Sequence, residues 1–233
     1  MIKLLLSNIM IVLYHGSQEI LERPTYGIGK KTNDYGQGFY CTEEPELAKE
    51  WACGSSASGY SNRYELDESD LVLLNLNSKE YSLMHWITIL LENRTFNVST
   101  DVANASKKFL IENYHIDLDG FDYIRGYRAD DSYFRYAQDF IEGGLSVDRL
   151  SKAIRLGNLG EQIMIRSPKA FEKLRFTGYE ICDHDRYFDA REKREEDARN
   201  EYRRIRSEPF DPNAITVLDL IRGTVSLNDP RLS

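Results

Sequence analysis

The amino-acid sequence predicts an α+β domain, and three observations carry this prediction. Short apolar segments and longer amphipathic segments follow one another without the regular strand–helix alternation of a parallel α/β fold. Hydrophobic residues make up 41% of the 233 residues and aromatic residues 12%, which excludes a disordered chain and allows a sizeable core. No segment repeats along the chain, which excludes a solenoid.

We expect residues 10–233 to form this single domain and residues 1–9 to be an extension that the fold does not need. Met10 lies directly before the first apolar strand. The residues before it include one lysine and no small-residue cleavage site, so they make a poor signal peptide. No later apolar run approaches membrane-spanning length, and no membrane partner is expected.

The net charge and the cysteines limit the function classes. A net charge of −8 disfavours a protein that binds nucleic acid regardless of sequence. The three cysteines, Cys41, Cys53 and Cys182, are odd in number and lack metal-ligand spacing, which favours a reducing compartment. No histidine pair has ligand spacing either, so no metal site is expected.

The first elements in the chain follow from apolar patterning and glycine. Alternation and β-branched residues predict a strand over 11–14, which Gly16 is expected to end. A second short strand is expected over 38–41. Thr42 can cap a helix over 43–53, because acidic residues and a proline follow it directly.

A loop and an alternating series of helices and strands are expected next. The small residues of 54–62 predict a loop. Apolar continuity predicts buried strands, and apolar residues at helical spacing predict helices. The expected strands are 71–76, 121–125, 161–165, 176–182 and 215–218. The expected helices are one from Ser78 or Lys79 to 93, 101–114, one from Asp130 or Asp131 to 142, 146–155 and 168–174.

A highly charged helix is expected over 185–206. Its charges are mixed in sign, and a few apolar residues, Tyr187, Phe188, Ala198 and Tyr202 among them, form a thin face. This pattern favours a solvated helix packed on one side, with an interaction surface as the alternative.

Two short segments are the candidate functional motifs. The first strand ends in His15-Gly16-Ser17, and a glycine-bearing loop leads from it to Gly36-Gln37-Gly38-Phe39-Tyr40. Glycine lets the backbone turn and approach a ligand closely. Alternation along the second strand places Tyr40 on the face opposite to Phe39 and Cys41. A lone histidine or a strand tyrosine is more often structural, so residue type alone leaves both interpretations open.

The order Tyr-His-Gly-Ser, a loop, then Asp-Tyr-Gly-Gln-Gly-Phe-Tyr-Cys-Thr resembles the nicotinamide site of ADP-ribosyltransferases of the His-Tyr-Glu type, which diphtheria toxin and poly-ADP-ribose polymerases carry. More closely, the chain resembles a bacterial family of unknown function, DUF3990, which is ADP-ribosyltransferase-like. The supporting segments are 43–52, 122–131, 160–163 and 229–232. The resemblance implies split mixed sheets around a nicotinamide cleft, with helical insertions at 79–114 and 129–155.

The resemblance also implies roles for individual residues. His15 would bond a ribose hydroxyl, the Gly16 backbone would hold the nicotinamide carboxamide, and Ser17 would assist at the ribose. Tyr40 would stack on the nicotinamide ring. Tyr35 and Tyr26 are possible second walls of the pocket, whereas Trp51 and Tyr60 are expected in the core and in a loop.

The third position departs from the His-Tyr-Glu pattern. The matching register places Gln162 at the catalytic point, and Glu161, its neighbour, faces the other side of the strand unless the strand bulges. A glutamine can bond and orient the ribose 2′-hydroxyl, but it supplies no negative charge. An edge-strand polar residue is the structural alternative for Gln162.

An acidic cluster surrounds two arginines downstream. Asp122, Asp130 and Asp131 flank Arg125 and Arg128. Helix capping and surface pairing are the favoured interpretation. The alternative is that Arg125, Arg128 or Asp130 lines the acceptor side of the cleft.

The resulting functional hypothesis is an NAD-dependent mono-ADP-ribosyltransferase with NAD as its substrate. The resemblance implies a cytoplasmic bacterial toxin or defence component with an antitoxin partner. The acceptor, whether protein, nucleic acid or small molecule, cannot be read from the sequence. A module that binds NAD or a nucleotide without turnover and an NAD glycohydrolase are the alternatives.

Overall fold

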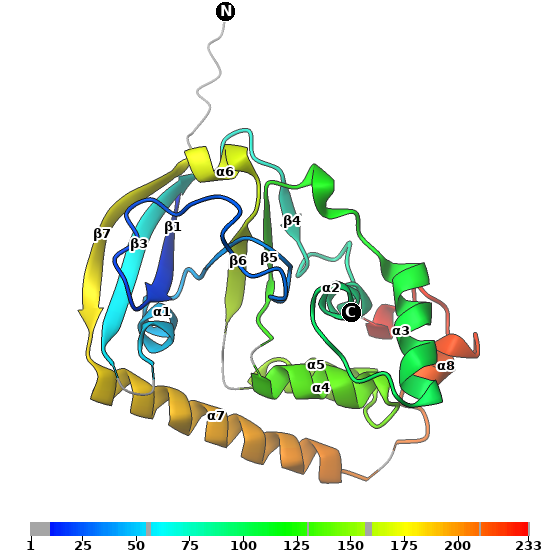
Figure 1. The fold of residues 1–233 in the computed structure, drawn as a ribbon. Helices are drawn as coiled ribbons and strands as arrows, with labels where there is room; N and C mark the ends of the chain where they lie inside the picture. The colour runs from blue at the N-terminus through cyan, green and yellow to red at the C-terminus, as the bar shows by residue number, and fades with distance from the viewer. Residues whose placement is uncertain (1–9, 55–56, 130, 157–159, 210, 233) are drawn as a thin grey trace, which may run out of the picture.

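The computed structural model describes residues 10–54, 57–129, 131–156, 160–209 and 211–232. Two sheets stand side by side, and most helices lie beside and below the second sheet (Figure 1). The predicted α+β class is confirmed. The expected extension at residues 1–9 and the expected helix start at Asp130 lie outside the described residues.

The first sheet is antiparallel and has the strand order β1-β3-β7. Its strands are β1 (Met10–Ser17), β3 (Gly59–Asp67) and β7 (Leu174–Cys182). Helix α1 (Pro45–Ala52) packs against β1 and β3, with Leu47, Ala48 and Ala52 buried. Pro45 occupies the first turn, where its missing N–H costs nothing.

The second sheet is mixed and has the order β2-β6-β5-β4. Its strands are β2 (Phe39–Cys41), β6 (Glu161–Ile165), β5 (Tyr123–Tyr127) and β4 (Leu73–Asn75). Only β4 and β5 run parallel. The sheets are joined where the Tyr14 and Thr42 backbones exchange hydrogen bonds of 2.8 and 2.9 Å. The motif strands β1 and β2 are therefore neighbours.

Helices complete the second half of the fold. The main ones are α2 (Leu83–Asn93), α3 (Asp101–Tyr114), α4 (Asp131–Ile141), α5 (Val147–Ala153) and α8 (Val217–Ile221). Short turns of helix are η1 (Leu118–Gly120), α6 (Pro168–Glu172) and η3 (Pro230–Leu232). In Figure 1, α3 and α8 lie at the right, beyond α2, and α4 and α5 lie below the second sheet.

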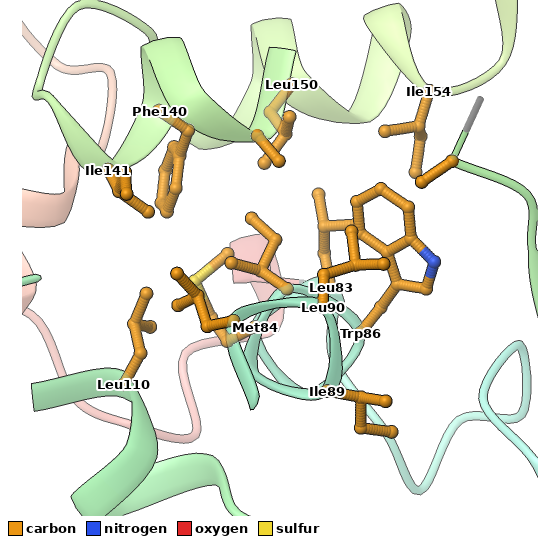
Figure 2. Packing of buried hydrophobic residues seen from close by; sticks show 14 of the residues in the cluster. Leu83, Met84, Trp86, Ile89, Leu90, Leu110, Phe140, Ile141, Leu150 and Ile154 are labelled. Atoms are coloured by element: carbon orange, nitrogen blue, oxygen red, sulfur yellow. The ribbon is translucent and has the colours of Figure 1, made fainter. Parts of the chain in front are cut away.

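The larger hydrophobic core centres on α2, whose apolar residues are buried on nearly every side. Figure 2 shows Met84, Leu90 and Trp86 of α2 pointing toward side chains of α4 and α5, such as Phe140 and Leu150. A helix that is apolar all round must be enclosed by other elements. This explains why the two expected helical insertions stay together as one layer.

Helix α7 (His184–Ser207) confirms the expected charged helix and runs below both halves of the molecule (Figure 1). Its buried residues are Tyr187, Ala198, Tyr202 and Ile205. The helix contacts α1 under the first sheet and α4 and α5 under the second. The solvated helix with one packed face is therefore the observed arrangement.

Two expected elements are wrong. The loop expected over 54–62 ends early, because residues 59–62 belong to β3, the central strand of the first sheet. Small polar residues hid this strand, yet Ser61 and Asn62 are buried. The strand expected over 215–218 is instead the start of α8, because Thr216 and Asp219 form a capping box, with the Thr216 N–H donating to Asp219 Oδ2 over 2.8 Å.

The expected end of the first strand is wrong as well. β1 continues through Gly16 to Ser17, in unbroken register with β3. A Cβ at Gly16 would lie 2.0 Å from the Ala48 carbonyl oxygen and 2.5 Å from the Ala52 nitrogen. Glycine is therefore needed there because α1 lies against the strand, and it does not break the strand.

Candidate functional site

A cavity of about 590 Å³ lies where β1, β2 and β6 meet the loop of residues 18–38. His15 of β1, Tyr40 of β2 and Gln162 of β6 all line it. Trp51 of α1 and Arg94, at the end of α2, also line the cavity. Three of the residues that the sequence singled out therefore come together, although 122 positions separate Tyr40 from Gln162.

The His15 imidazole is held in one orientation. Its Nδ1 lies 2.7 Å from the Tyr40 carbonyl oxygen, and its ring packs on Phe39 with the ring centroids 4.4 Å apart. A carbonyl oxygen only accepts, so Nδ1 carries the proton and Nε2 is left as an acceptor. Burial lowers the pKa of His15 below its ordinary value of 6.5, and the hydrogen bond to Tyr40 only partly opposes this shift. The neutral form is therefore favoured.

Gly16 and Ser17 follow His15 but do not line the cavity. The Tyr14 backbone bonds Thr42, and backbone groups two residues apart face the same strand edge. The Gly16 N–H and C=O thus face the edge of β1 away from β3. Ser17 Oγ instead makes a local turn, accepting from the Glu19 N–H over 3.0 Å and donating to the Glu19 carbonyl.

A turn over residues 33–36 holds Tyr35 and Tyr40 in place. The Gly36 N–H donates to the Asn33 carbonyl over 3.0 Å, and Gly36 has a φ of +83°. Tyr40 Oη donates to the Gly36 carbonyl over 2.7 Å and accepts from the Tyr35 N–H over 3.0 Å. With its hydroxyl tied back, Tyr40 can offer only its ring to a ligand. Burial raises the pKa of the Tyr40 phenol well above its ordinary value.

Tyr35 does not line the cavity. Its side chain is 1% exposed within the larger core, and its hydroxyl donates to the Tyr127 carbonyl. A Cβ at Gly126 would lie 2.4 Å from the Tyr35 hydroxyl oxygen, so the absence of a side chain in β5 makes room for this ring. Tyr35 therefore belongs to the larger core next to the cavity and not to the cavity wall.

Gln162 lies in the middle of the second sheet, because β6 pairs with both β2 and β5. The edge-strand alternative is therefore wrong. Its Nε2 donates to Asp34 Oδ2 over 2.8 Å and to the Tyr127 carbonyl over 3.3 Å. The Gln162 side chain is 4% exposed, and its amide belongs to the wall of the cavity.

Asp34 is a cavity carboxylate that the sequence analysis did not single out. It is 6% exposed, and Arg94 Nη1 lies 2.7 Å from its Oδ1. The Ala129 N–H donates to Oδ2 over 2.9 Å. Asp34 stands directly before Tyr35 in the quoted motif, which was the available signal, whereas nothing in the sequence marked Arg94.

The cavity wall is rich in cations. Arg23 and Lys30 of the loop, Arg94 and Arg128 all line it, against the single carboxylate of Asp34. The Arg128 guanidinium lies over the Trp51 indole, 4.2 Å from the ring centroid. Trp51 therefore lies at the cavity and not simply in the core, which corrects the expectation for this residue. Arg128 lines this cavity, and its place on the acceptor side of a cleft stays a prediction.

The profile of the family described as "Protein of unknown function (DUF3990)" matches residues 11–176. The chain belongs to this family. Neither a curated protein nor a solved structure matches the chain. In this DUF3990 protein the matched segment contains His15, Tyr40 and Gln162.

The remaining candidates of this DUF3990 protein lie away from the cavity. Arg125 Nη1 pairs with Glu43 at 2.7 Å and with Glu161 at 3.1 Å, as surface pairing predicts. Glu161 therefore faces away from Gln162, and β6 keeps an unbroken register with both neighbours. Tyr26 is 56% exposed outside this cavity, and Tyr60 lies in β3 and not in a loop.

Among the residues that the structure describes, none of the helices combines the length and the apolar character that spanning a membrane requires. No three or more histidine, cysteine, aspartate or glutamate side chains gather in the described part of the chain in a group that could hold a metal ion.

Proposed function

We propose that the protein is an NAD-dependent mono-ADP-ribosyltransferase. The observation that carries the proposal is the convergence of His15, Tyr40 and Gln162 on one cavity of about 590 Å³. This volume is within the range of small-molecule sites. The residue types and their order resemble the His-Tyr-Glu site, with glutamine in the third place. An ADP-ribosyltransferase-like arrangement of the two sheets is part of the proposal.

The contacts of Tyr40 and His15 support a role for each of them. The Tyr40 ring is the shelf for the nicotinamide ring, held by its tied hydroxyl. The free Nε2 of His15 accepts a hydrogen bond from a ribose hydroxyl. The family resemblance assigns the carboxamide to the Gly16 N–H and C=O, which face the edge of β1 away from β3 and lie outside the described cavity wall. Ser17, tied into a local turn, has no role in the proposal.

The reaction breaks the bond between ribose C1′ and the nicotinamide nitrogen. The electron pair of that bond leaves with nicotinamide, and positive charge develops on the ribose. An acceptor lone pair then bonds C1′, and the acceptor loses its proton to solvent. Gln162 Oε1 accepts a hydrogen bond from the ribose 2′-hydroxyl and so orients the sugar. Because an amide supplies no negative charge to this step, we propose transfer of single ADP-ribose units and not elongation of a polymer.

The charge of the cavity supports a dinucleotide substrate. NAD carries a pyrophosphate, and four cations line the cavity of a protein whose net charge is −8. The Trp51 indole Nε1 is buried and has no hydrogen-bond partner among the described residues. Because this N–H group donates no hydrogen bond to a described residue, it can donate one to a polar atom of a ligand.

The test is incubation of the purified protein with NAD labelled in its adenylate part. Released nicotinamide and label on macromolecules are measured together. We expect both, and we expect the His15→Ala variant to lose both. Glu161→Gln is the matched control, because it changes a neighbouring polar residue of β6 that faces away from the cavity. Absence of nicotinamide release by the wild-type protein contradicts the proposal.

One observation favours a second candidate, a module that binds NAD or a nucleotide without turnover. The polar group of β6 in the cavity is an amide and not a carboxylate. Saturable NAD binding without nicotinamide release identifies this module. Nicotinamide release without label on any acceptor identifies an NAD glycohydrolase, in which water takes the place of the acceptor.

The biological setting belongs to the same proposal. The family resemblance supports a bacterial toxin or defence component that acts in the cytoplasm and is restrained by an antitoxin protein. Expression of the wild-type protein should then slow growth of a bacterial host. Expression of His15→Ala at equal level should not, and equal growth with both proteins contradicts the toxin setting.

A further inference from the structure

The cavity contains a buried carboxylate whose partners converge from three other parts of the chain. Asp34 lies in the loop between β1 and β2, and its partners are Arg94 at the end of α2, Ala129 just after β5 and Gln162 of β6. Asp34 accepts hydrogen bonds from all three partners, at 2.7, 2.9 and 2.8 Å. A carboxylate held by three donors has little freedom to move.

These contacts decide how the Gln162 amide is turned. Its Nε2 faces two groups that can only accept, Asp34 Oδ2 and the Tyr127 carbonyl oxygen. The Tyr35 hydroxyl also lies beside the amide, but it donates its proton to the same Tyr127 carbonyl. The flipped amide would place Oε1 against these two oxygens and lose both hydrogen bonds. Oε1 is therefore fixed on the other side of the amide, where it makes no hydrogen bond with any described residue.

Asp34 orients the Gln162 amide and adds little net charge to the cavity wall. Arg94 lies 2.7 Å from its other oxygen, so the negative charge of Asp34 is largely balanced within the wall of the cavity. What Asp34 contributes to Gln162 is a strong hydrogen bond to an ionised acceptor, which holds and polarises the amide.

We propose that Asp34 is a positioning residue, which locks the Gln162 amide so that Oε1 meets the ribose 2′-hydroxyl. The Asp34–Gln162 pair then takes the place of the single glutamate of the His-Tyr-Glu sites. The inference rests on the proposed transferase function. It competes with a purely structural role, in which Asp34 only ties the 18–38 loop to Arg94 and Ala129.

The pair offers a charge-swap experiment. Asp34→Asn removes one of the two accepting oxygens. Gln162→Glu places a second carboxylate where the amide lay 2.8 Å from Asp34, and two such carboxylates repel. The double variant D34N/Q162E restores one donor and one acceptor with their roles exchanged. Glu161→Gln is the control on the opposite face of β6.

The measurements are kcat and KM for nicotinamide release, with the melting temperature of each variant. We expect Asp34→Asn to lower kcat about 10- to 100-fold, because the amide loses its fixed orientation, with less than about a threefold change in KM. We expect the double variant to exceed both single variants in kcat. If Asp34→Asn does not fold, the gain from Gln162→Glu to the double variant carries the test.

Other outcomes overturn the inference. A lower melting temperature with unchanged kcat in Asp34→Asn indicates the purely structural role. Losses in kcat that simply multiply in the double variant show that the two residues act independently. If the wild-type protein binds NAD but releases no nicotinamide, the transferase proposal fails by itself. The same four variants are then compared by NAD affinity in calorimetry, where absence of coupling between Asp34 and Gln162 overturns the inference.

Discussion

At the scale of single residues, the site depends on backbone carbonyls that fix side-chain hydrogen bonds. The Tyr127 carbonyl accepts from the Tyr35 hydroxyl, from Trp86 Nε1 at 2.9 Å and from Gln162 Nε2 at 3.3 Å. The Tyr40 carbonyl does the same for His15. Because a carbonyl oxygen cannot donate, each of these contacts requires a donor on the side chain, and for His15 it selects the tautomer with the proton on Nδ1.

The lowered pKa of His15 gives the first prediction at this scale. The unfolded imidazole takes up its proton near pH 6.5, whereas the folded one resists protonation to lower pH. The contribution of the His15 imidazole to the free energy of unfolding is therefore fully present above about pH 6.5 and is lost as the pH falls through the folded-state pKa. His15→Asn keeps a donor for the Tyr40 carbonyl but does not titrate. We expect the melting temperature of the wild type to fall more than that of His15→Asn between about pH 7.5 and about pH 5.

NAD binding should follow the same titration, because protonation of Nε2 removes the acceptor for the ribose hydroxyl. The wild type should bind NAD more weakly as the pH falls, whereas the weaker affinity of His15→Asn should change less. Equal pH dependence of affinity and stability in both proteins would contradict this account of His15.

Gly16 gives the second prediction. An added Cβ would lie 2.0 Å from a backbone oxygen of α1, so the helix must move away from β1. We expect Gly16→Ala to lower the free energy of unfolding by about 1–3 kcal/mol in urea denaturation. Gly120→Ala is the control, since nothing lies within 4 Å of its added Cβ. A loss as small in Gly16→Ala as in the control would show that α1 yields freely.

At the scale of elements, α7 is held by contacts at its middle and near its C-terminal end. Arg194 Nε donates to Glu50 Oε2 of α1 over 3.0 Å. The Tyr202 ring packs on Tyr136 of α4 with centroids 3.8 Å apart, and its hydroxyl donates to Asp139 over 2.6 Å. A helix with so thin an apolar face depends on these few contacts.

The third prediction follows from this anchoring. Tyr202 is 5% exposed, and its loss opens a cavity between α7 and α4. We expect Tyr202→Ala to lower the free energy of unfolding by about 3 kcal/mol in urea denaturation. Arg203→Ala, at an exposed position one residue away, should change it by less than about 0.5 kcal/mol. Similar effects of both substitutions would argue against an anchoring role of Tyr202.

Elements with a clear apolar pattern were predictable from the sequence. The expected bounds 161–165 and 101–114 coincide with β6 and α3. The whole of β3 (Gly59–Asp67) was missed, because its first residues, including the buried polar Ser61 and Asn62, were expected in a loop. Asn62 is satisfied by its contacts, donating to the Glu19 carbonyl over 3.1 Å and accepting from the Leu21 N–H over 3.0 Å, and single-sequence periodicity does not reveal such contacts.

The site was predictable only where a motif preceded it. His15 and Tyr40 were marked by their glycine neighbours, and Gln162 by its register in β6. The partners of Asp34 were not predictable, since Arg94 and Ala129 reach it from 60 and 95 positions away. Ser17 looked functional because a hydroxyl after His-Gly is suited to a ribose, yet the same hydroxyl closes a two-residue turn.

At the scale of the whole molecule, charge is distributed unevenly. The net charge is −8, yet the cavity wall holds four cations and one carboxylate. Arg94 is paired with that carboxylate. Arg23 and Lys30 have no acidic partner among the described residues, and both lie on the loop of residues 18–38. An anionic ligand is therefore attracted to the cavity and not to the surface as a whole.

The last prediction uses salt to test this attraction. Raising the ionic strength from about 0.1 M to about 1 M shortens the Debye length from about 10 Å to about 3 Å, so cations at an open cavity lose their effect on a pyrophosphate. We expect the Kd for NAD in calorimetry to rise at least about threefold over this range, whereas that for uncharged adenosine should change less. The double variant R23Q/K30Q should bind NAD more weakly at low salt and respond less to added salt. Lys31→Gln is the matched control, because Lys31 is an exposed neighbour of Lys30 that does not line the cavity. If NAD and adenosine respond equally, or if Lys31→Gln acts like the double variant, the cations of the loop do not hold the pyrophosphate.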